Sequence, residues 1–214
     1  MTWTNAIEHI VILIISFIVG VGGYIGMNKE PFQQQKKRLD WLLSIVIQLV
    51  IYIWLAKVLV LFNIAIKDPF AVLAYPSNAT MLYLALIFTG IHIAVHIKKD
   101  VLSGREMIQV FVPVLISTHF VYSCIQLYQT ERTAFLIQAG IGVLLILIYV
   151  VMEKLHQAEG SLMLFMVWSF GNGLIAVMYK HFTLFGYTIS PFIYVGFMVG
   201  SLLFVWKNKG ERKF

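Results

Sequence analysis

Seven long apolar stretches constrain the fold of this chain more than any other feature of its sequence. A helix needs about 20 mainly apolar residues to cross a ~30 Å hydrocarbon core. Stretches of that kind are centred on residues 6–27, 39–62, 80–97, 107–127, 133–153, 161–179 and 190–207. Since they fill most of the 214 residues, the sequence predicts one integral membrane domain over residues 1–214, an all-α bundle of seven transmembrane helices.

The composition agrees with membrane residence. Only 12% of the residues are charged, whereas a soluble domain carries about a quarter. This excludes a water-soluble enzyme, a coiled coil and a disordered tail. The single cysteine, Cys124, excludes an internal disulfide, a CxxC redox couple and a zinc site built on thiolates.

The distribution of Lys and Arg predicts the orientation, because basic residues are retained on the cytoplasmic side. Twelve of the sixteen lie in the first, third and fifth loops and in the C-terminal tail. We therefore expect a multi-pass protein of the cell membrane, with the N-terminus outside and the C-terminus in the cytoplasm. A basic rim facing anionic lipid explains the net charge of +6 without nucleic acid, so membrane lipids are the expected partners and the oligomeric state stays open.

Polar side chains within the predicted spans are the main functional signal, because they are costly in hydrocarbon. From the helical rise, His119 and Asn172 lie ~3 Å to the outer side of the midplane, Gln138 ~7 Å and His9 ~12 Å. Apart from His92 and His96, the polar groups therefore gather in the outer half. This asymmetry predicts a cavity that opens to the outside.

The helix faces on which these residues lie support the same hypothesis. His119, Ser123 and Gln126 share one helix face at i, i+4 and i+7, and comparable stripes hold Trp168 with Asn172 and His9 with Ser16. The candidate solute-binding residues are His119, Asn172, Gln138, Ser123 and His9. The simpler alternative, favoured for Gln138, Ser123 and Gln126, is that the polar groups bond to one another between packed helices.

Other polar features are weaker candidates. His92 and His96 have the i, i+4 spacing at which imidazoles share a metal or ligate haem iron, yet the same face offers no Cys, Asp or Glu. We expect no metal site, and the cofactor question stays open. Lys57 is expected to reach the outer interface with its long stem. Residues 69–78, which begin with Pro69, form either a cap or re-entrant turn on the outer face or a plain interfacial loop.

Three function classes follow. The favoured one is a small carrier or channel for a solute that enters from outside, with His119 and Asn172 at its site. The second is an intramembrane enzyme that acts on a lipid or lipid-linked substrate, with His119 or His9 as base and Ser123 and His181 nearby. The sequence contains no GxSxG, HExxH or paired membrane carboxylates, so enzyme activity stays undecided and no catalytic residue is assigned. The third class is a non-catalytic subunit or assembly factor.

Overall fold

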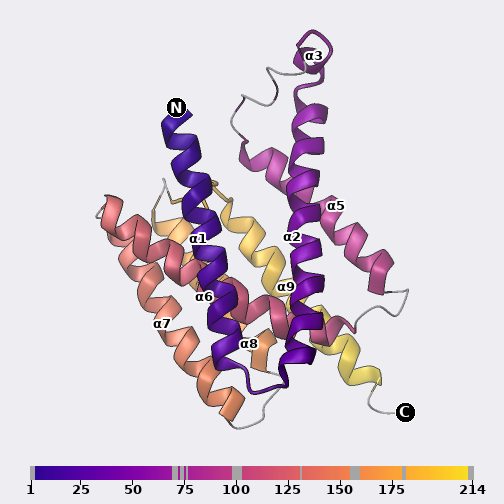
Figure 1. Cartoon of the computed structure of the whole chain (residues 1–214), viewed down its shortest axis with the longest axis vertical. Coiled ribbons are helices and arrows are strands. Elements are labelled where there is room, and N and C mark those ends of the chain that lie inside the picture. The colour runs from indigo at the N-terminus through magenta and orange to yellow at the C-terminus, as the bar shows by residue number, and fades with distance from the viewer. Residues whose placement is uncertain are drawn as a thin grey trace. The chain divides into compact units, whose positions relative to one another are not determined.

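The computed structural model folds this chain into helices joined by short connections (Figure 1). It describes residues 3–68, 72, 75, 77–97, 103–130, 132–154, 160–179 and 182–211. The helices in these ranges are α1 (Trp3–Met27), α2 (Phe32–Val60), α3 (Phe62–Ala65), α5 (Ala79–Ile97), α6 (Gly104–Thr130), α7 (Thr133–Lys154), α8 (Gly160–Met178) and α9 (Pro191–Glu211). The only extended pairing within them is an isolated bridge between Leu184 and Tyr187. The all-α class is therefore confirmed.

The apolar stretches of the sequence coincide with these helices almost throughout. Five of them, α1, α2, α6, α7 and α8, are long and apolar enough to cross a membrane. In α5 and α9 the apolar segments are the shorter Ala79–Val95 and Pro191–Leu203. The structure is thus compatible with a multi-pass membrane protein. The number of seven crossings, the orientation of the termini and the cell membrane location stay predictions.

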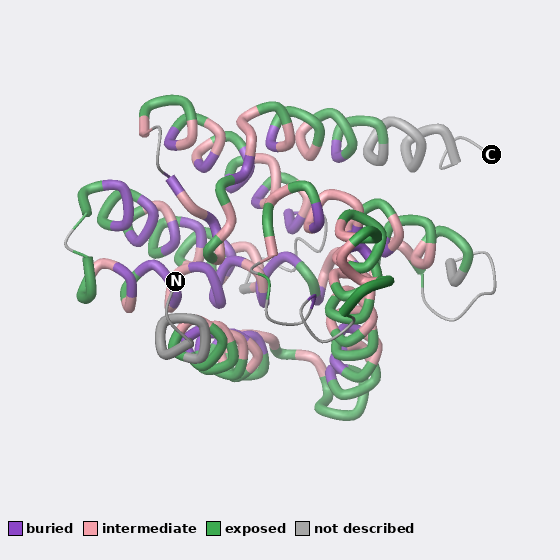
Figure 2. The backbone as a smooth tube through the Cα atoms, turned by 90° about the horizontal axis from the view of Figure 1, so that it is seen from above, coloured by how far each residue is buried: buried purple, intermediate pink, exposed green. Residues whose placement is uncertain are grey.

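Large apolar side chains lie on the outside of the helices, where a water-soluble protein has few contiguous ones. Ile18 in α1 is 63% exposed and Phe192 in α9 is 84% exposed. Along α2 only 6% of the most apolar window is buried, and Figure 2 shows exposed turns along the helices. A hydrocarbon environment solvates such surfaces at no cost, so the pattern agrees with a membrane location.

Contacts divide the chain into two compact units. The first comprises Met1–Gln35 and Ile108–Phe214, and the second comprises Lys36–Met107. The expectation of a single membrane domain over residues 1–214 stays a prediction.

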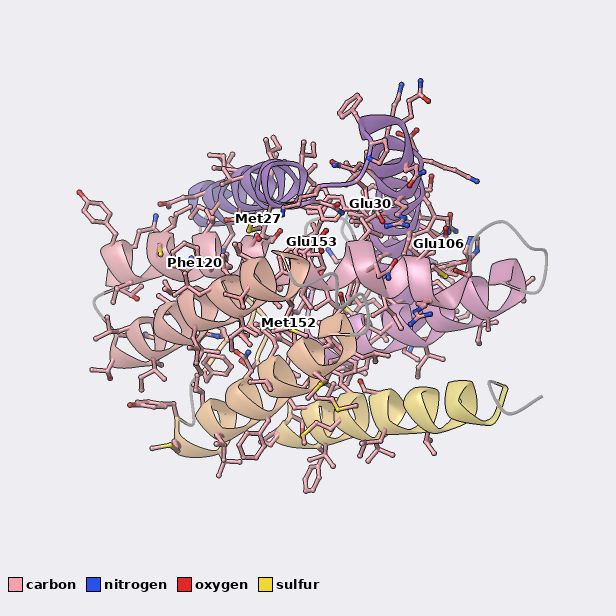
Figure 3. The ribbon with its side chains drawn as sticks, turned by 90° about the horizontal axis from the view of Figure 1, so that it is seen from below. Met27, Glu30, Glu106, Phe120, Met152 and Glu153 are labelled. Atoms are coloured by element: carbon pink, nitrogen blue, oxygen red, sulfur yellow. The ribbon has the colours of Figure 1, made fainter. Side chains whose placement is uncertain are left out.

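In the first unit α6 is more enclosed than α1, α7 and α8, since 56% of its apolar window is buried, against 22–33% for those three helices. Glycines let the neighbouring helices approach it closely. A Cβ atom at Gly20 of α1 would contact Thr118 Oγ1 and lie 2.8 Å from the Thr118 backbone nitrogen. A Cβ atom at Gly142 of α7 would lie 2.9 Å from Cβ of Phe120, which Figure 3 labels on α6. Helix α8 packs in turn on α7 and α9.

In the second unit local hydrogen bonds define the helix ends. Ser103 and Glu106 form a capping box at the start of α6, in which the Ser103 backbone N–H donates to Glu106 Oε2 at 3.0 Å and the Glu106 N–H donates to Ser103 Oγ at 3.3 Å. Lys57 donates from Nζ to the Tyr75 carbonyl at 2.8 Å, which gives this lysine a structural partner. Of the segment 69–78, only residues 72, 75, 77 and 78 are described, so its predicted turn or loop lies largely outside the described residues.

Candidate functional site

A continuous polar network crosses three helices in the interior of the first unit. His119 of α6 faces two groups, because Gln138 Nε2 of α7 lies 2.9 Å from its Nε2 and the Trp168 indole N–H of α8 donates to its Nδ1 at 3.1 Å. Gln138 Nε2 also donates to Asn172 Oδ1 at 3.0 Å, and Asn172 Nδ2 donates to the Trp168 carbonyl at 2.9 Å. All four side chains are at most 2% exposed. The four contacts therefore form a buried chain that begins and ends at Trp168.

Helical spacing and close helix packing bring these groups together. Trp168 and Asn172 are separated by four residues on α8, so both project from one face. Gly171 of the same helix meets Ile141 of α7, whose Cδ1 would lie 3.0 Å from an added Cβ atom. Because α7 also approaches α6 closely, the amide of Gln138 reaches the helices on both sides. Gln138 is thus the centre of the network.

The hydrogen atoms of this network cannot all be placed without conflict. The Trp168 indole N–H only donates and the Trp168 carbonyl only accepts, so the chain of contacts has a fixed donor at one end and a fixed acceptor at the other. A neutral imidazole carries one hydrogen and accepts only at its other nitrogen. Rotating the amide of Gln138 or Asn172 moves the conflict to another contact, and an imidazolium at His119 adds a further N–H. In every arrangement one contact therefore opposes two like groups.

A strained reverse turn covers His119. Leu184 and Tyr187 exchange both backbone hydrogen bonds, at 2.9 and 3.0 Å, around the central residues Phe185 and Gly186. Both central residues have positive φ, 52° and 82°, as in a type I′ turn. A phenylalanine in this conformation costs about 1–2 kcal/mol. Its position is supported by packing, because the ring lies edge-on to His119 at a centroid distance of 5.7 Å.

The Phe185 ring is only partly enclosed by other side chains. It also packs on the ring of Tyr122 at 5.3 Å and on the buried cluster of Ile12, Tyr122 and Phe135. Phe185 is nevertheless only half-buried, while His119 beneath it is 1% exposed. Phe185 is therefore a partly exposed side chain in direct ring contact with the buried His119.

His9 lies beside this turn and makes none of the network contacts. A Cβ atom at Gly186 would lie 3.6 Å from His9 Cε1 and 3.7 Å from its Nδ1. The sequence groups His9 with His119, whereas the structure places it against the backbone of the turn that covers His119.

The structure unites four of the five candidate residues. His119, Asn172, Gln138 and Ser123 lie in one cluster, in which Ser123 Oγ is 3.4 Å from Gln138 Oε1. The sequence predicts that these side chains line a cavity open to the outside. In the structure they are instead buried among the helices and bonded to one another. Burial of their polar groups is cheaper when they pair with each other than when they face hydrocarbon.

Sequence reasoning missed two contributors. Helical spacing places Trp168 on the same face as Asn172 but does not predict that its indole N–H donates to His119. Phe185 is not among the predicted site residues. The aromatic–glycine pair Phe185-Gly186 in a short connection is a usable signal, because Gly favours turns with positive φ.

The arrangement differs from that of a serine nucleophile. Ser123 Oγ donates to the backbone carbonyl of His119 at 2.8 Å, and both ring nitrogens of His119 face Trp168 and Gln138. An activated serine instead donates to an imidazole nitrogen. Among the described residues the site therefore lacks the serine–imidazole contact that acyl transfer uses.

The remaining histidine candidates do not form a metal site in the described part of the chain. In the second unit Tyr52 Oη lies 3.2 Å from Nδ1 of His92. No group of three His, Cys, Asp or Glu residues able to hold a metal occurs within the described residues. The side chain of His96 and the whole of His181 lie outside them.

Comparisons with protein-family models, with curated proteins and with solved structures found no match for this chain.

Proposed function

We propose that this protein is a small multi-pass carrier or channel whose solute binds at the His119–Gln138–Asn172 network. The main observation behind the proposal is that the hydrogen-bond donors and acceptors of the network cannot all be paired with one another. The protein alone therefore leaves one contact unsatisfied. A purely structural network gains from complete pairing, and each interhelical hydrogen bond stabilises a membrane protein by only about 0.6 kcal/mol on average. A ligand that supplies the missing partner explains why such groups are kept in an apolar interior.

The location of the network supports transport over a superficial binding role. His119, Gln138 and Asn172 belong to three helices that are long and apolar enough to cross a membrane. Polar residues in such spans often mark solute pathways. The closed arrangement corresponds to an occluded state, in which the solute site is shut off from both sides. Opening of the Phe185 cover gives one of the two access routes that a carrier needs.

A thiol-accessibility experiment tests this proposal without knowledge of the solute. Cys124 is the only cysteine, so a Cys124→Ser background is free of thiols. In it, Ser123→Cys places one small thiol at the edge of the network. Right-side-out and inverted vesicles are then treated with a membrane-impermeant methanethiosulfonate reagent. We expect the thiol to react from either side, because a transport site is reached from both.

The matched control is Ala85→Cys, at a fully buried position in the second unit. This thiol is expected to stay protected in both vesicle preparations. Reaction of Ser123→Cys from one side alone contradicts transport and favours the intramembrane enzyme. Protection from both sides, in a protein that inserts normally, contradicts the proposal and favours the non-catalytic subunit.

A further inference from the structure

Four basic side chains gather in the second unit, where α2 and α6 begin. Lys36, Lys37 and Arg38 lie in the first two turns of α2, and Arg105 lies in the first turn of α6. The first turn of α6 belongs to the same compact unit as this part of α2, because that unit extends from Lys36 to Met107. We call these four basic residues the basic cluster.

The two helix starts lie close enough for their charges to interact. The positive charges of Arg38 and Lys37 both act on the carboxylate of Glu106, the residue that follows Arg105. Glu106 Oε2 accepts hydrogen bonds from the Ser103 backbone N–H at 3.0 Å and from the Ser103 hydroxyl at 2.8 Å, which fix this carboxylate at the helix start. The bases of α2 therefore lie near the first turn of α6.

The basic cluster keeps an excess of positive charge. The nearest acidic residues in the sequence are Asp40 and Glu106, and with these two carboxylates counted the net charge is +2. Lys36, Lys37 and Arg105 are all exposed. An anion can therefore reach the cluster without displacing a buried group.

The part of α2 that follows the cluster is apolar and exposed. Trp41 lies one turn after Lys37 on the same helix face, and tryptophan is typical of the level of lipid headgroups. The same face continues to Ile51 and Leu55, which are 53% and 45% exposed. A molecule whose charged group lies at the cluster can therefore extend an apolar chain along this face.

We propose that the basic cluster binds the headgroup of an anionic phospholipid, with Lys37 and Arg105 at its phosphate and the acyl chains along α2. Clusters of at least about four bases at the cytoplasmic end of membrane helices are typical of such binding, because the cytoplasmic leaflet carries anionic lipid. The predicted orientation places this end of α2 and α6 on that side. The cluster belongs to the second unit and the His119 network to the first, so the proposal is independent of the proposed solute binding.

Lipid binding to the full-length protein in micelles of an uncharged detergent tests this proposal. Anionic phosphatidylglycerol and zwitterionic phosphatidylcholine with the same acyl chains are compared, and native mass spectrometry counts the lipid molecules bound. We expect phosphatidylglycerol to bind more tightly. A base near the headgroup contributes about fivefold to such binding, so Lys37→Gln combined with Arg105→Gln is expected to weaken it roughly 30-fold. Equal binding of the two lipids to the unmodified protein overturns the proposal.

The matched control removes one lysine and one arginine elsewhere. Lys67 and Arg132 are also exposed, so Lys67→Gln combined with Arg132→Gln makes the same change in net charge. We expect this control to leave phosphatidylglycerol binding unchanged. Equal weakening in the two double variants overturns the proposal, because the attraction is then a property of the overall charge.

Two further measurements separate charge from folding and lipid from free phosphate. Lys37→Arg combined with Arg105→Lys keeps both charges and is expected to retain binding, whereas a loss as large as in the glutamine variant contradicts the electrostatic cause. Glycerol 1-phosphate carries a phosphate without acyl chains and is expected not to compete. If it displaces phosphatidylglycerol, the cluster takes a free phosphate and the lipid proposal is wrong.

Discussion

Replacement of Gly20 by alanine tests how closely α1 packs on α6. The added Cβ atom would contact Thr118 Oγ1 and lie 2.8 Å from the Thr118 backbone nitrogen and 3.0 Å from its Cα. Ordinary contact begins at 3.4 Å, so α1 must move away from α6 by about 0.6 Å, the difference between 3.4 and 2.8 Å. Backbone atoms cannot rotate out of the way as the end of a flexible side chain can. The strain is therefore shared by the whole helix pair.

The size of the stability loss caused by Gly20→Ala follows from comparison with Gly22→Ala on the same helix. A Cβ atom at Gly22 meets no atom within 4 Å, so that variant gains the helix propensity of alanine without a clash. Gly20→Ala gains the same propensity but adds an overpacking cost of about 1–3 kcal/mol. The propensity cancels in the difference between the two variants. We therefore expect Gly20→Ala to be about 1–3 kcal/mol less stable than Gly22→Ala, which is roughly 5-fold to 140-fold in the unfolding equilibrium.

Unfolding in mixed micelles of dodecyl maltoside and sodium dodecyl sulfate, followed by far-ultraviolet circular dichroism, measures this difference. Gly26→Ala is a second control, because its Cβ position is equally open. If Gly20→Ala and Gly22→Ala unfold at the same detergent fraction, α1 does not pack on α6 through Gly20, and the backbone approach at Thr118 is wrong.

Two smaller changes test other parts of the structure. Gly186→Ala, at φ 82°, is expected to destabilise the protein by about 1–2 kcal/mol in the same unfolding assay. Gly140→Ala is the control, because the space around its Cβ position is open. Equal stability of the two variants contradicts the turn conformation. Ser103→Ala removes the cap of α6 and is expected to cost about 0.5–2 kcal/mol, seen as faster amide hydrogen exchange in the first turn. Ser44→Ala, where the exposed hydroxyl bonds only to a carbonyl one turn earlier, is the control, and equal exchange at the start of α6 in both variants contradicts the cap.

Much of the secondary structure was predictable because a membrane helix satisfies its own backbone hydrogen bonds. Apolar length alone then predicts where helices lie, and the stretch 133–153 matches α7 (Thr133–Lys154) almost residue for residue. The polar residues of the site were predictable for a related reason. His119 and Asn172 are conspicuous in apolar spans, and their similar estimated depth agrees with their link through Gln138.

Whether the site is open to water could not be predicted in the same way. Periodicity assigns a residue to a helix face but does not say whether that face meets water, lipid or another helix. Gln138 illustrates this limit, because its two bonds depend on how closely α6, α7 and α8 approach. His9 illustrates it again, since it shares a predicted outer location with His119 but lies against the turn at Gly186.

By itself the sequence determined the helices, their apolar surfaces and the polar side chains that stand out within them, because each of these depends on local composition. Only the tertiary structure decided that Gln138 joins His119 to Asn172, that the indole of Trp168 faces the same imidazole and that Phe185 covers it. Such contacts join residues far apart in the chain, and their geometry is set by glycine-mediated helix packing and by a two-residue turn whose strain is offset by aromatic packing.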